Sequence, residues 1–261
     1  LAKPPPMFID VSDWLNHEHS EYPVDDFLRQ PMLTRRLTES GPGVAFFDWD
    51  LDGREELFFG TGAGGKLVGY KVAAAGRLAK LIEPAFNLPF AGDMLGLGAD
   101  RQGLLAVVSA HDSPKPIAPS LQRFRRGASE QETIELPSPN HSDAGSIAVA
   151  HVDSDNYLDV FVAGRGIPSK FPQPASSWLL RGGPGGLKLD AEQSAVFANI
   201  GLVTAAVFVN LDDDELPELA LATEWGPIQI FKNTGGKFTD ATKEWGLDQR
   251  PGIWQTLAAG D

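Results

Sequence analysis

A short acidic turn between two apolar runs recurs along the 261-residue chain, and its spacing limits what the chain can fold into. Successive copies begin at positions 48, 98, 151, 210 and 261, so the intervals are 50, 53, 59 and 51 residues. Repeats of this length that hold several strands are typical of propeller blades rather than solenoid coils. Strand-like runs such as "KLVGYKV" and "PIQIFKN" follow the turns, and few stretches have a helical period. The pattern predicts an all-β chain, a β-propeller of four-stranded blades.

The repeat also predicts how the chain is divided. We expect one β-propeller domain over residues 1–261, with a lead-in segment at 1–39 that includes an outer strand. Blades are expected to start near residues 40, 91, 143 and 202, and a fifth blade begins at 252–261. A row of four to five blades leaves strand edges exposed at both ends. We therefore expect the chain to be part of a larger propeller of about seven blades, or to be closed by a further chain.

The residue pattern of the turn indicates calcium binding. Alternate residues of a tight turn converge on one point, and Ca²⁺ is bound by hard oxygen ligands. In the first copy Gly53 allows the positive φ of a sharp turn. The closing acid stands at position nine rather than twelve and strands flank the turn, so the turn is not an EF-hand. The ligands predicted for this copy are Asp48, Asp50, Asp52, the backbone carbonyl of Arg54, and Glu56.

The other copies keep the frame less completely. His151 is a poor first ligand because imidazole suits softer metals, and Glu215 strains the fourth turn where the frame has glycine. In the second copy, Gly98 to Ala106, the closing acid is lost, and we expect no metal there. The ligands predicted elsewhere are Asp153, Asp155, Tyr157 and Asp159 in the third copy, and Asn210, Asp212, Asp214, Leu216 and Glu218 in the fourth. For a single copy, an ordinary polar turn is the alternative; three copies in register favour Ca²⁺, first at the first turn and then at the fourth and third.

Composition excludes several classes of function. The chain has 22 Lys and Arg against 35 Asp and Glu, a net charge of −13, and no basic face for nucleic acid. It has no cysteine, which excludes disulfides, thiolate chemistry and zinc sites built on sulfur. No apolar run reaches the roughly 18 residues that a membrane-spanning helix needs.

Other signals are weaker. "GTGAGGKL" (60–67) fits most of a P-loop but lacks the final hydroxyl and a following helix, so a glycine-rich turn is the better interpretation. His17 and His19 would share one face of a strand, but no third metal ligand is identifiable. His111 and His141 lie in loop-like stretches, and no G-x-S-x-G motif supports a catalytic triad.

Three stretches carry a family resemblance: "GPGVAFFDWDLDGREELFFG", "HVDSDNYLDVFVAGR" and "GLVTAAVFVNLDDDELPELALAT". With them the chain resembles the FG-GAP/VCBS repeat β-propellers, in particular the bacterial exported branch with an UnbV/ASPIC-type module and integrin-α-like calcium loops. The resemblance covers nearly the whole chain and is weakest between residues 84 and 139. It implies that the calcium ligands carry over onto Asp48, Asp50, Asp52 and Glu56, and that the protein is exported to the periplasm, cell surface or medium.

We therefore expect a non-enzymatic, exported, calcium-binding propeller scaffold that binds a protein or a polysaccharide, or a further chain that completes the propeller. The repeated acidic turn and the missing catalytic constellation favour this hypothesis. Two alternatives are a polysaccharide-active lyase or hydrolase on a propeller fold and a structural subunit of a larger envelope complex. No nucleic acid and no membrane-spanning segment are expected.

Overall fold

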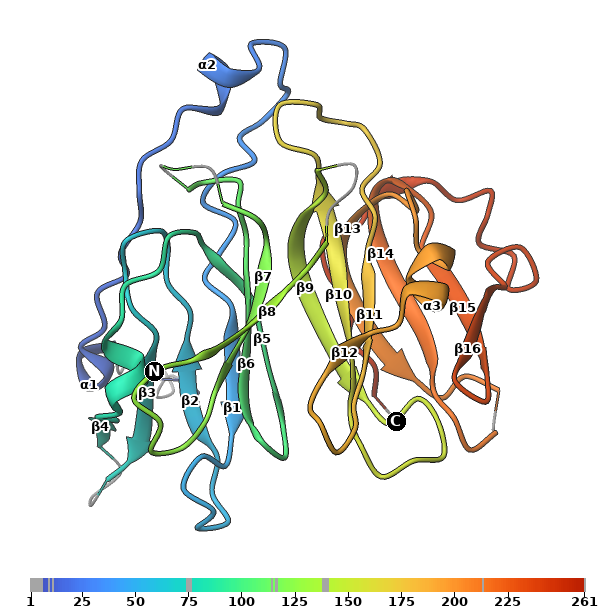
Figure 1. The fold of residues 1–261 in the computed structure, drawn as a ribbon. Coiled ribbons are helices and arrows are strands. Elements are labelled where there is room, and N and C mark those ends of the chain that lie inside the picture. Colours follow the sequence, from blue (N-terminus) through green and yellow to red (C-terminus); the bar gives the residue numbers. More distant parts are fainter. Residues whose placement is uncertain are drawn as a thin grey trace, which may run out of the picture.

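The computed structural model describes residues 7–8, 10, 12–73, 77–113, 115, 117–137, 141–212 and 214–260. Within them the chain forms four antiparallel sheets, three of four strands and the last of five, which confirms the all-β class. In every sheet the first four strands each pair with the next strand along the chain. The sheets follow one another from the blue to the red end of the chain in Figure 1. Asp261, where a fifth turn was expected to begin, lies outside the described residues.

In the second, third and fourth sheets the first two strands are longer than the next two. The first sheet holds β1 (Val44–Phe47), β2 (Glu56–Phe59), β3 (Val68–Val72) and β4 (Leu78–Lys80). The second holds β5 (Met94–Asp100), β6 (Gly103–Val108), β7 (Ser120–Phe124) and β8 (Glu132–Glu135). The third holds β9 (Asp143–Ala150), β10 (Asp159–Gly166), β11 (Trp178–Arg181) and β12 (Lys188–Leu189). The fourth holds β13 (Leu202–Val209), β14 (Glu218–Gly226), β15 (Gln229–Thr234) and β16 (Lys237–Asp240).

Two expectations about the ends of the chain differ from the structure. Residues 252–253, expected to begin a fifth blade, form the short strand β17 (Gly252–Ile253), which pairs with β14 of the fourth sheet. The described residues of the lead-in segment form the helices α1 (Ser12–Leu15) and α2 (Asp26–Arg29) and no strand. No helix in the described part of the chain is long and apolar enough to cross a membrane.

The first strands of neighbouring sheets lie side by side: β1 contacts β5, β5 contacts β9, and β9 contacts β13. Glycines permit this close approach. A Cβ atom on Gly96 of β5 would lie 2.8 Å from the carbonyl oxygen of Gly145 in β9, and one on Gly43 would lie 3.0 Å from that of Leu95. Both distances are shorter than ordinary contacts, so a larger side chain would push the strands apart.

Aromatic side chains fill the space between the sheets. In the first half Trp49, Phe58, Phe86 and Phe124 form one buried cluster, in which Phe86 comes from the short 3₁₀ helix η2 (Pro84–Asn87). In the second half Phe197, which follows α3 (Ala191–Val196), packs with ring centroids 5.1 Å from Phe161 and 5.0 Å from Phe231. Short helical pieces between sheets thus supply rings that join one sheet to the next.

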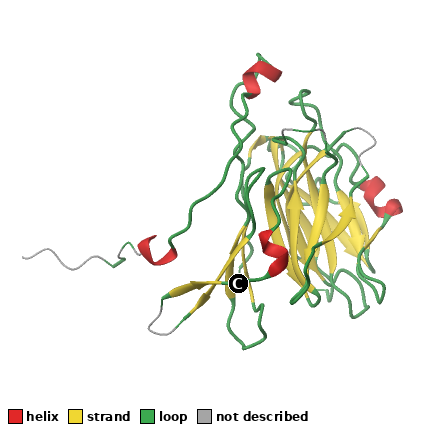
Figure 2. Cartoon of the chain, turned by 60° about the vertical axis from the view of Figure 1, so that its left-hand side comes forward, coloured by secondary structure: helices red, strands yellow, loops and turns green. Residues whose placement is uncertain are grey.

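The lead-in segment crosses one end of the sheets. Figure 1 shows α2 at this end and the β1–β2 and β9–β10 turns at the other, while Figure 2 shows the long loop between α1 and α2. Arg35 forms an ion pair with the buried Glu224 of β14, and the Gln30 side chain bonds the backbone of Phe171. The glycine-rich stretch 60–67 connects β2 to β3, and a Cβ on Gly62 would lie 2.6 Å from the Ser20 carbonyl. These glycines make room for the lead-in segment.

Candidate functional site

The first acidic turn gathers three of the four carboxylates that the sequence indicated, whereas Asp52 is outside the group and accepts the N–H of Arg54 at 2.9 Å. One oxygen each from Asp48, Asp50 and Glu56 lies within 4.8 Å of the others. Glu56 begins β2 and is buried, its Oε2 accepts from the backbone N–H of Trp49 at 2.7 Å, and burial raises its pKa. The Asp48 oxygens each accept a backbone N–H at 3.1 Å, from Asp52 and from the next residue, a glycine with φ +86°. Backbone N–H groups of the turn thus fix the Asp48 and Glu56 carboxylates in place, as a metal-binding turn requires.

The fourth turn repeats this geometry. Asp212, Asp214 and Glu218 also bring one oxygen each within 4.8 Å of one another. The closing acid again accepts from the second residue of the turn, here Leu211 N to Glu218 Oε2 at 2.9 Å. The Asn210 side chain, predicted as the first ligand, instead donates its amide to the Asp214 carbonyl. The predicted carbonyl ligand, Leu216, donates its N–H to Asp214 at 2.7 Å.

The third turn is arranged around an arginine. Nη1 of Arg181 lies 3.5 Å from Asp153 and 3.7 Å from the fully buried Asp159, and Nε lies 3.0 Å from Asp190. The Tyr157 carbonyl accepts from Nδ1 of His151 at 2.8 Å. Asp155 accepts the N–H of Tyr157 at 2.7 Å. The guanidinium thus stands beside the acids where the sequence led us to expect a metal ion.

The second copy is not a longer turn at all. Asp100 pairs with Gly103 in a two-residue hairpin, so Gly98 and Ala106, expected to frame a turn, lie in strands β5 and β6. Asp100 accepts two backbone N–H groups and the guanidinium of the fully buried Arg123 at 2.5 Å. The bounds expected for this copy were therefore wrong. Two residues separate the paired ends of β5 and β6, six fewer than in the corresponding loops of the other three sheets.

Sequence reasoning missed a basic residue that all four sheets share. In each sheet this residue directly follows the third-strand residue that pairs with the second residue of the second strand. The four residues are Lys71, Arg125, Arg181 and Lys232. Lys71 Nζ lies 3.9 Å from Asp50, Lys232 Nζ lies 2.5 Å from Asp212, and Arg125 bonds Gln102 at 2.8 Å. The signal was present in the sequence as the runs VGYK, QRFR, WLLR and QIFK.

A pocket of about 1090 Å³ lies at the opposite end of the sheets from the acidic turns. Its walls come from the β6–β7 connection, the end of β8 and the β10–β11 connection. Although the chain carries a net charge of −13, the charged lining of this pocket holds three cationic residues against two acidic ones. The ionisable lining residues are Arg29, His111, Lys115, Glu135, His141, Asp143 and Lys170. Such a lining attracts an anionic ligand.

His111 is held in this pocket by a buried acid. Its Nε2 lies 2.9 Å from Oδ1 of Asp26, whose Oδ2 accepts the backbone N–H groups of Leu37 and Thr38. Burial acts to raise the pKa of Asp26, but the hydrogen bonds from His111, Thr38 and Leu37 outweigh it and lower that pKa. The charged Asp26 orients the imidazole, an arrangement that general bases use. The sequence had placed His111 in a loop without a role.

The other histidines have separate partners. His17 stacks on Phe59 with ring centroids 4.8 Å apart, and its Nδ1 lies 3.4 Å from the Tyr70 hydroxyl. His19 contacts Glu21 at 2.7 Å. The rings of His17 and His19 are 6.4 Å apart and tilted, so the two side chains point to different partners.

Comparison with protein-family models and with curated proteins found no match for this chain. Function is therefore argued from the geometry.

Proposed function

We propose that this chain is a non-enzymatic scaffold of propeller type that binds Ca²⁺ at one end and an acidic glycan at the other. The observation that carries the proposal is the convergence of three carboxylate oxygens within 4.8 Å in the first and in the fourth turn. The four successive sheets, with their first strands packed side by side, support the blade arrangement. Further blades, or a further chain, would complete the ring.

Calcium binding should differ among the turns because the resident basic side chains differ. In the first turn Nζ of Lys71 lies 3.9 Å from Asp50. In the fourth turn Nζ of Lys232 lies 2.5 Å from the proposed ligand Asp212. In the third turn Arg181 already compensates the acids. The first turn therefore binds Ca²⁺ best, the fourth less well and the third least. Weak sites of this kind are filled where calcium is millimolar, which supports an exported protein.

The glycan is proposed from the charge of the pocket. Arg29, Lys115 and Lys170 surround a hollow large enough for several sugar rings, and carboxylates or sulfates of an acidic polysaccharide would pair with them. Because the basic side chains are gathered in one pocket of a chain with net charge −13, we propose that the pocket binds a short anionic segment of the glycan rather than a large basic protein surface.

The calcium proposal is tested by thermal melts in EDTA and across a Ca²⁺ titration, with Mg²⁺ as a control. A ligand that binds only the folded state raises the melting temperature with concentration. We expect Asp50→Asn to remove part of the Ca²⁺-dependent rise and Glu244→Gln, at an exposed position, to leave it unchanged. Equal responses in the two variants would reject the first turn as a site.

The glycan proposal is tested by calorimetry with a polyuronate, with neutral dextran as the control. Lys170→Ala should weaken binding, whereas Lys237→Ala, exposed on β16, should not. Failure to bind the polyuronate, together with capture of a protein from envelope extracts, would replace the glycan by a protein partner.

A second candidate is a polysaccharide lyase or hydrolase, favoured by the Asp26–His111 pair at the pocket. A base oriented in this way can remove a proton next to a uronate carboxylate. Incubation with the polyuronate distinguishes the two functions, because an enzyme shortens the polymer and a binding protein does not. Shortening that His111→Gln abolishes would establish the enzyme.

A further inference from the structure

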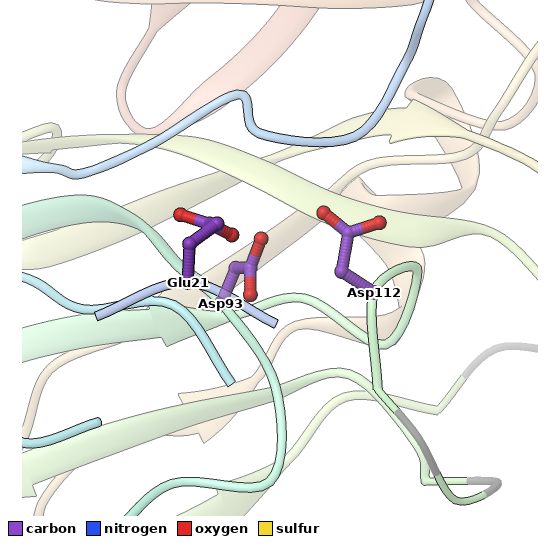
Figure 3. Close-up of side chains that lie close together, drawn as sticks. All are labelled: Glu21, Asp93 and Asp112. Carbon is purple, nitrogen blue, oxygen red and sulfur yellow. The ribbon is translucent and has the colours of Figure 1, made fainter. Parts of the chain in front are cut away.

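Three carboxyl groups from distant parts of the chain meet beneath the lead-in segment. Glu21 belongs to that segment, Asp93 directly precedes β5, and Asp112 lies in the loop after β6. One oxygen from each lies within 4.8 Å of the others, and Figure 3 shows the groups beside one another. The Asp93 and Asp112 side chains are buried, with residues only 1% and 3% exposed.

Each carboxylate uses one oxygen for a protein partner and leaves the other without one. Among the described residues, Glu21 Oε1, Asp93 Oδ2 and Asp112 Oδ1 are buried and have no hydrogen-bond partner. The partners of the other oxygens are Ala63 N on Asp93 at 2.8 Å, Glu39 N on Asp112 at 3.2 Å and His19 Nε2 beside Glu21 at 2.7 Å. The protein therefore fixes three carboxylates in place and leaves one free oxygen on each.

The charge of this cluster is not balanced by the side chains around it. His19 faces Glu21, and His111 Nε2 lies 3.9 Å from the free oxygen of Asp112 but is already bonded to Asp26. Burial, with the neighbouring Asp93 carboxyl, raises the pKa of Asp112 to about 8 and also raises that of Glu21. Buried acids without a counter-charge destabilise the fold unless a proton or a cation joins them.

We propose that Glu21, Asp93 and Asp112 form a binding site for one hard divalent cation, Ca²⁺ in the first place. The ligand set is all oxygen and anionic, which suits Ca²⁺ rather than a soft metal. Oxygens on opposite sides of Ca²⁺ stand about 4.6–5.2 Å apart, twice the Ca–O distance of about 2.3–2.6 Å. The three oxygens all lie within 4.8 Å of one another, which is compatible with ligands of one Ca²⁺.

This site is distinct from the acidic turns, which lie at the other end of the sheets. Its three ligands come from the lead-in segment, the start of the second sheet and the loop after β6. A bound cation would therefore fasten the lead-in segment to the second sheet. The proposal does not depend on calcium binding in the turns.

Equilibrium dialysis of the full chain tests the site in a background that carries Asp50→Asn, Asp153→Asn and Asp214→Asn, one substitution in each acidic turn. In this background we expect one Ca²⁺ per chain to persist, and Asp93→Asn or Asp112→Asn to abolish it. Asparagine keeps the oxygen that accepts the N–H of Ala63 or Glu39, so both variants should fold. Glu130→Gln, at an exposed position, is the matched control and should bind like the background.

Thermal melts add a readout that a merely structural role would not produce. In EDTA we expect Asp93→Asn to melt at or above the temperature of the background chain, because one buried negative charge is gone. With Ca²⁺ the order should reverse, because only the background chain gains from the ion. Absence of bound Ca²⁺ in the background, or unchanged binding in both variants, would overturn the proposal and leave a proton-sharing cluster. Equal binding of Mg²⁺ would overturn the choice of Ca²⁺.

Discussion

The ammonium of Lys232 donates to the carboxylate of Asp212 across the fourth acidic turn, with Nζ 2.5 Å from Oδ2. This hydrogen bond lowers the pKa of Asp212 and raises that of Lys232. The corresponding atoms of Lys71 and Asp50 in the first turn are 3.9 Å apart. A lysine that already neutralises a ligand competes with an incoming cation, so turns with nearly the same acids differ in the charge they offer.

Removal of that competing lysine should strengthen calcium binding. We expect Lys232→Met to raise the Ca²⁺ affinity of the fourth turn up to about fivefold, because the exposed ion pair no longer competes with the cation. Calorimetric titration in the Asp50→Asn background measures this. Lys237→Met provides the control on the neighbouring strand. Weaker binding by Lys232→Met would show that the lysine supports the site rather than competing for it.

The third turn should behave in the opposite way. Arg181 is the only cation within ion-pair distance of Asp159 among the described residues, and that acid is fully buried. We expect Arg181→Gln to lower the free energy of unfolding by about 2–4 kcal/mol in EDTA, and added Ca²⁺ to restore part of it. Urea unfolding with and without Ca²⁺ gives both numbers, and Arg250→Gln, at an exposed position, is the control. A loss that Ca²⁺ does not reduce at all would contradict a shared cation position.

Stability should also depend on pH through Asp112. Its pKa is raised from 3.8 to about 8, mainly by burial and then by the Asp93 carboxyl. Between these values the folded chain holds a proton that the unfolded chain has lost, so rising pH favours unfolding. In EDTA the free energy of unfolding should fall as the pH rises from 5 to about 8 and then level off. Asp112→Asn should flatten that fall in urea titrations, and parallel curves for the two proteins would contradict the assignment.

The close approach of the first strands predicts a packing effect. A Cβ on Gly96 would meet the Gly145 carbonyl at 2.8 Å, whereas one on Gly183 would meet nothing closer than 3.9 Å. We expect Gly96→Ala to lower the free energy of unfolding by about 1–3 kcal/mol, and Gly183→Ala to change it by less than about 0.5 kcal/mol. If the two variants lose the same free energy of unfolding in urea, the close contact between β5 and β9 does not limit the side chain at Gly96.

The sequence was informative where function follows a short repeated pattern. Alternating acids between apolar runs predicted the first and fourth turns, because the ligands of one loop are neighbours in the chain. The strands follow from the same pattern, since each turn joins two runs that pair. The prediction for the second copy was wrong because strand residues can match the spacing of the turn by chance. Gly98 lies in β5 and pairs with Leu105, and Ala106 lies in β6 and pairs with Leu97.

Sites built from distant residues were not visible in the sequence. Glu21, Asp93 and Asp112 lie in irregular segments, share no motif and meet only because the lead-in segment crosses the second sheet. The same is true of His111 and Asp26, which are 85 residues apart. The basic residue in or directly after each third strand was visible in the sequence, but its role depends on the strand register that brings it to the turn.

The hairpin between β5 and β6 shows how little chain this architecture needs. Two residues, Arg101 and Gln102, suffice there, whereas eight residues separate the paired ends of β1 and β2, of β9 and β10, and of β13 and β14. Six residues in each of those three loops are therefore dispensable for joining the strands. Apart from Trp49 and Val152, which are buried in the core, these residues can be exchanged, shortened or redesigned while the sheets beneath them stay the same.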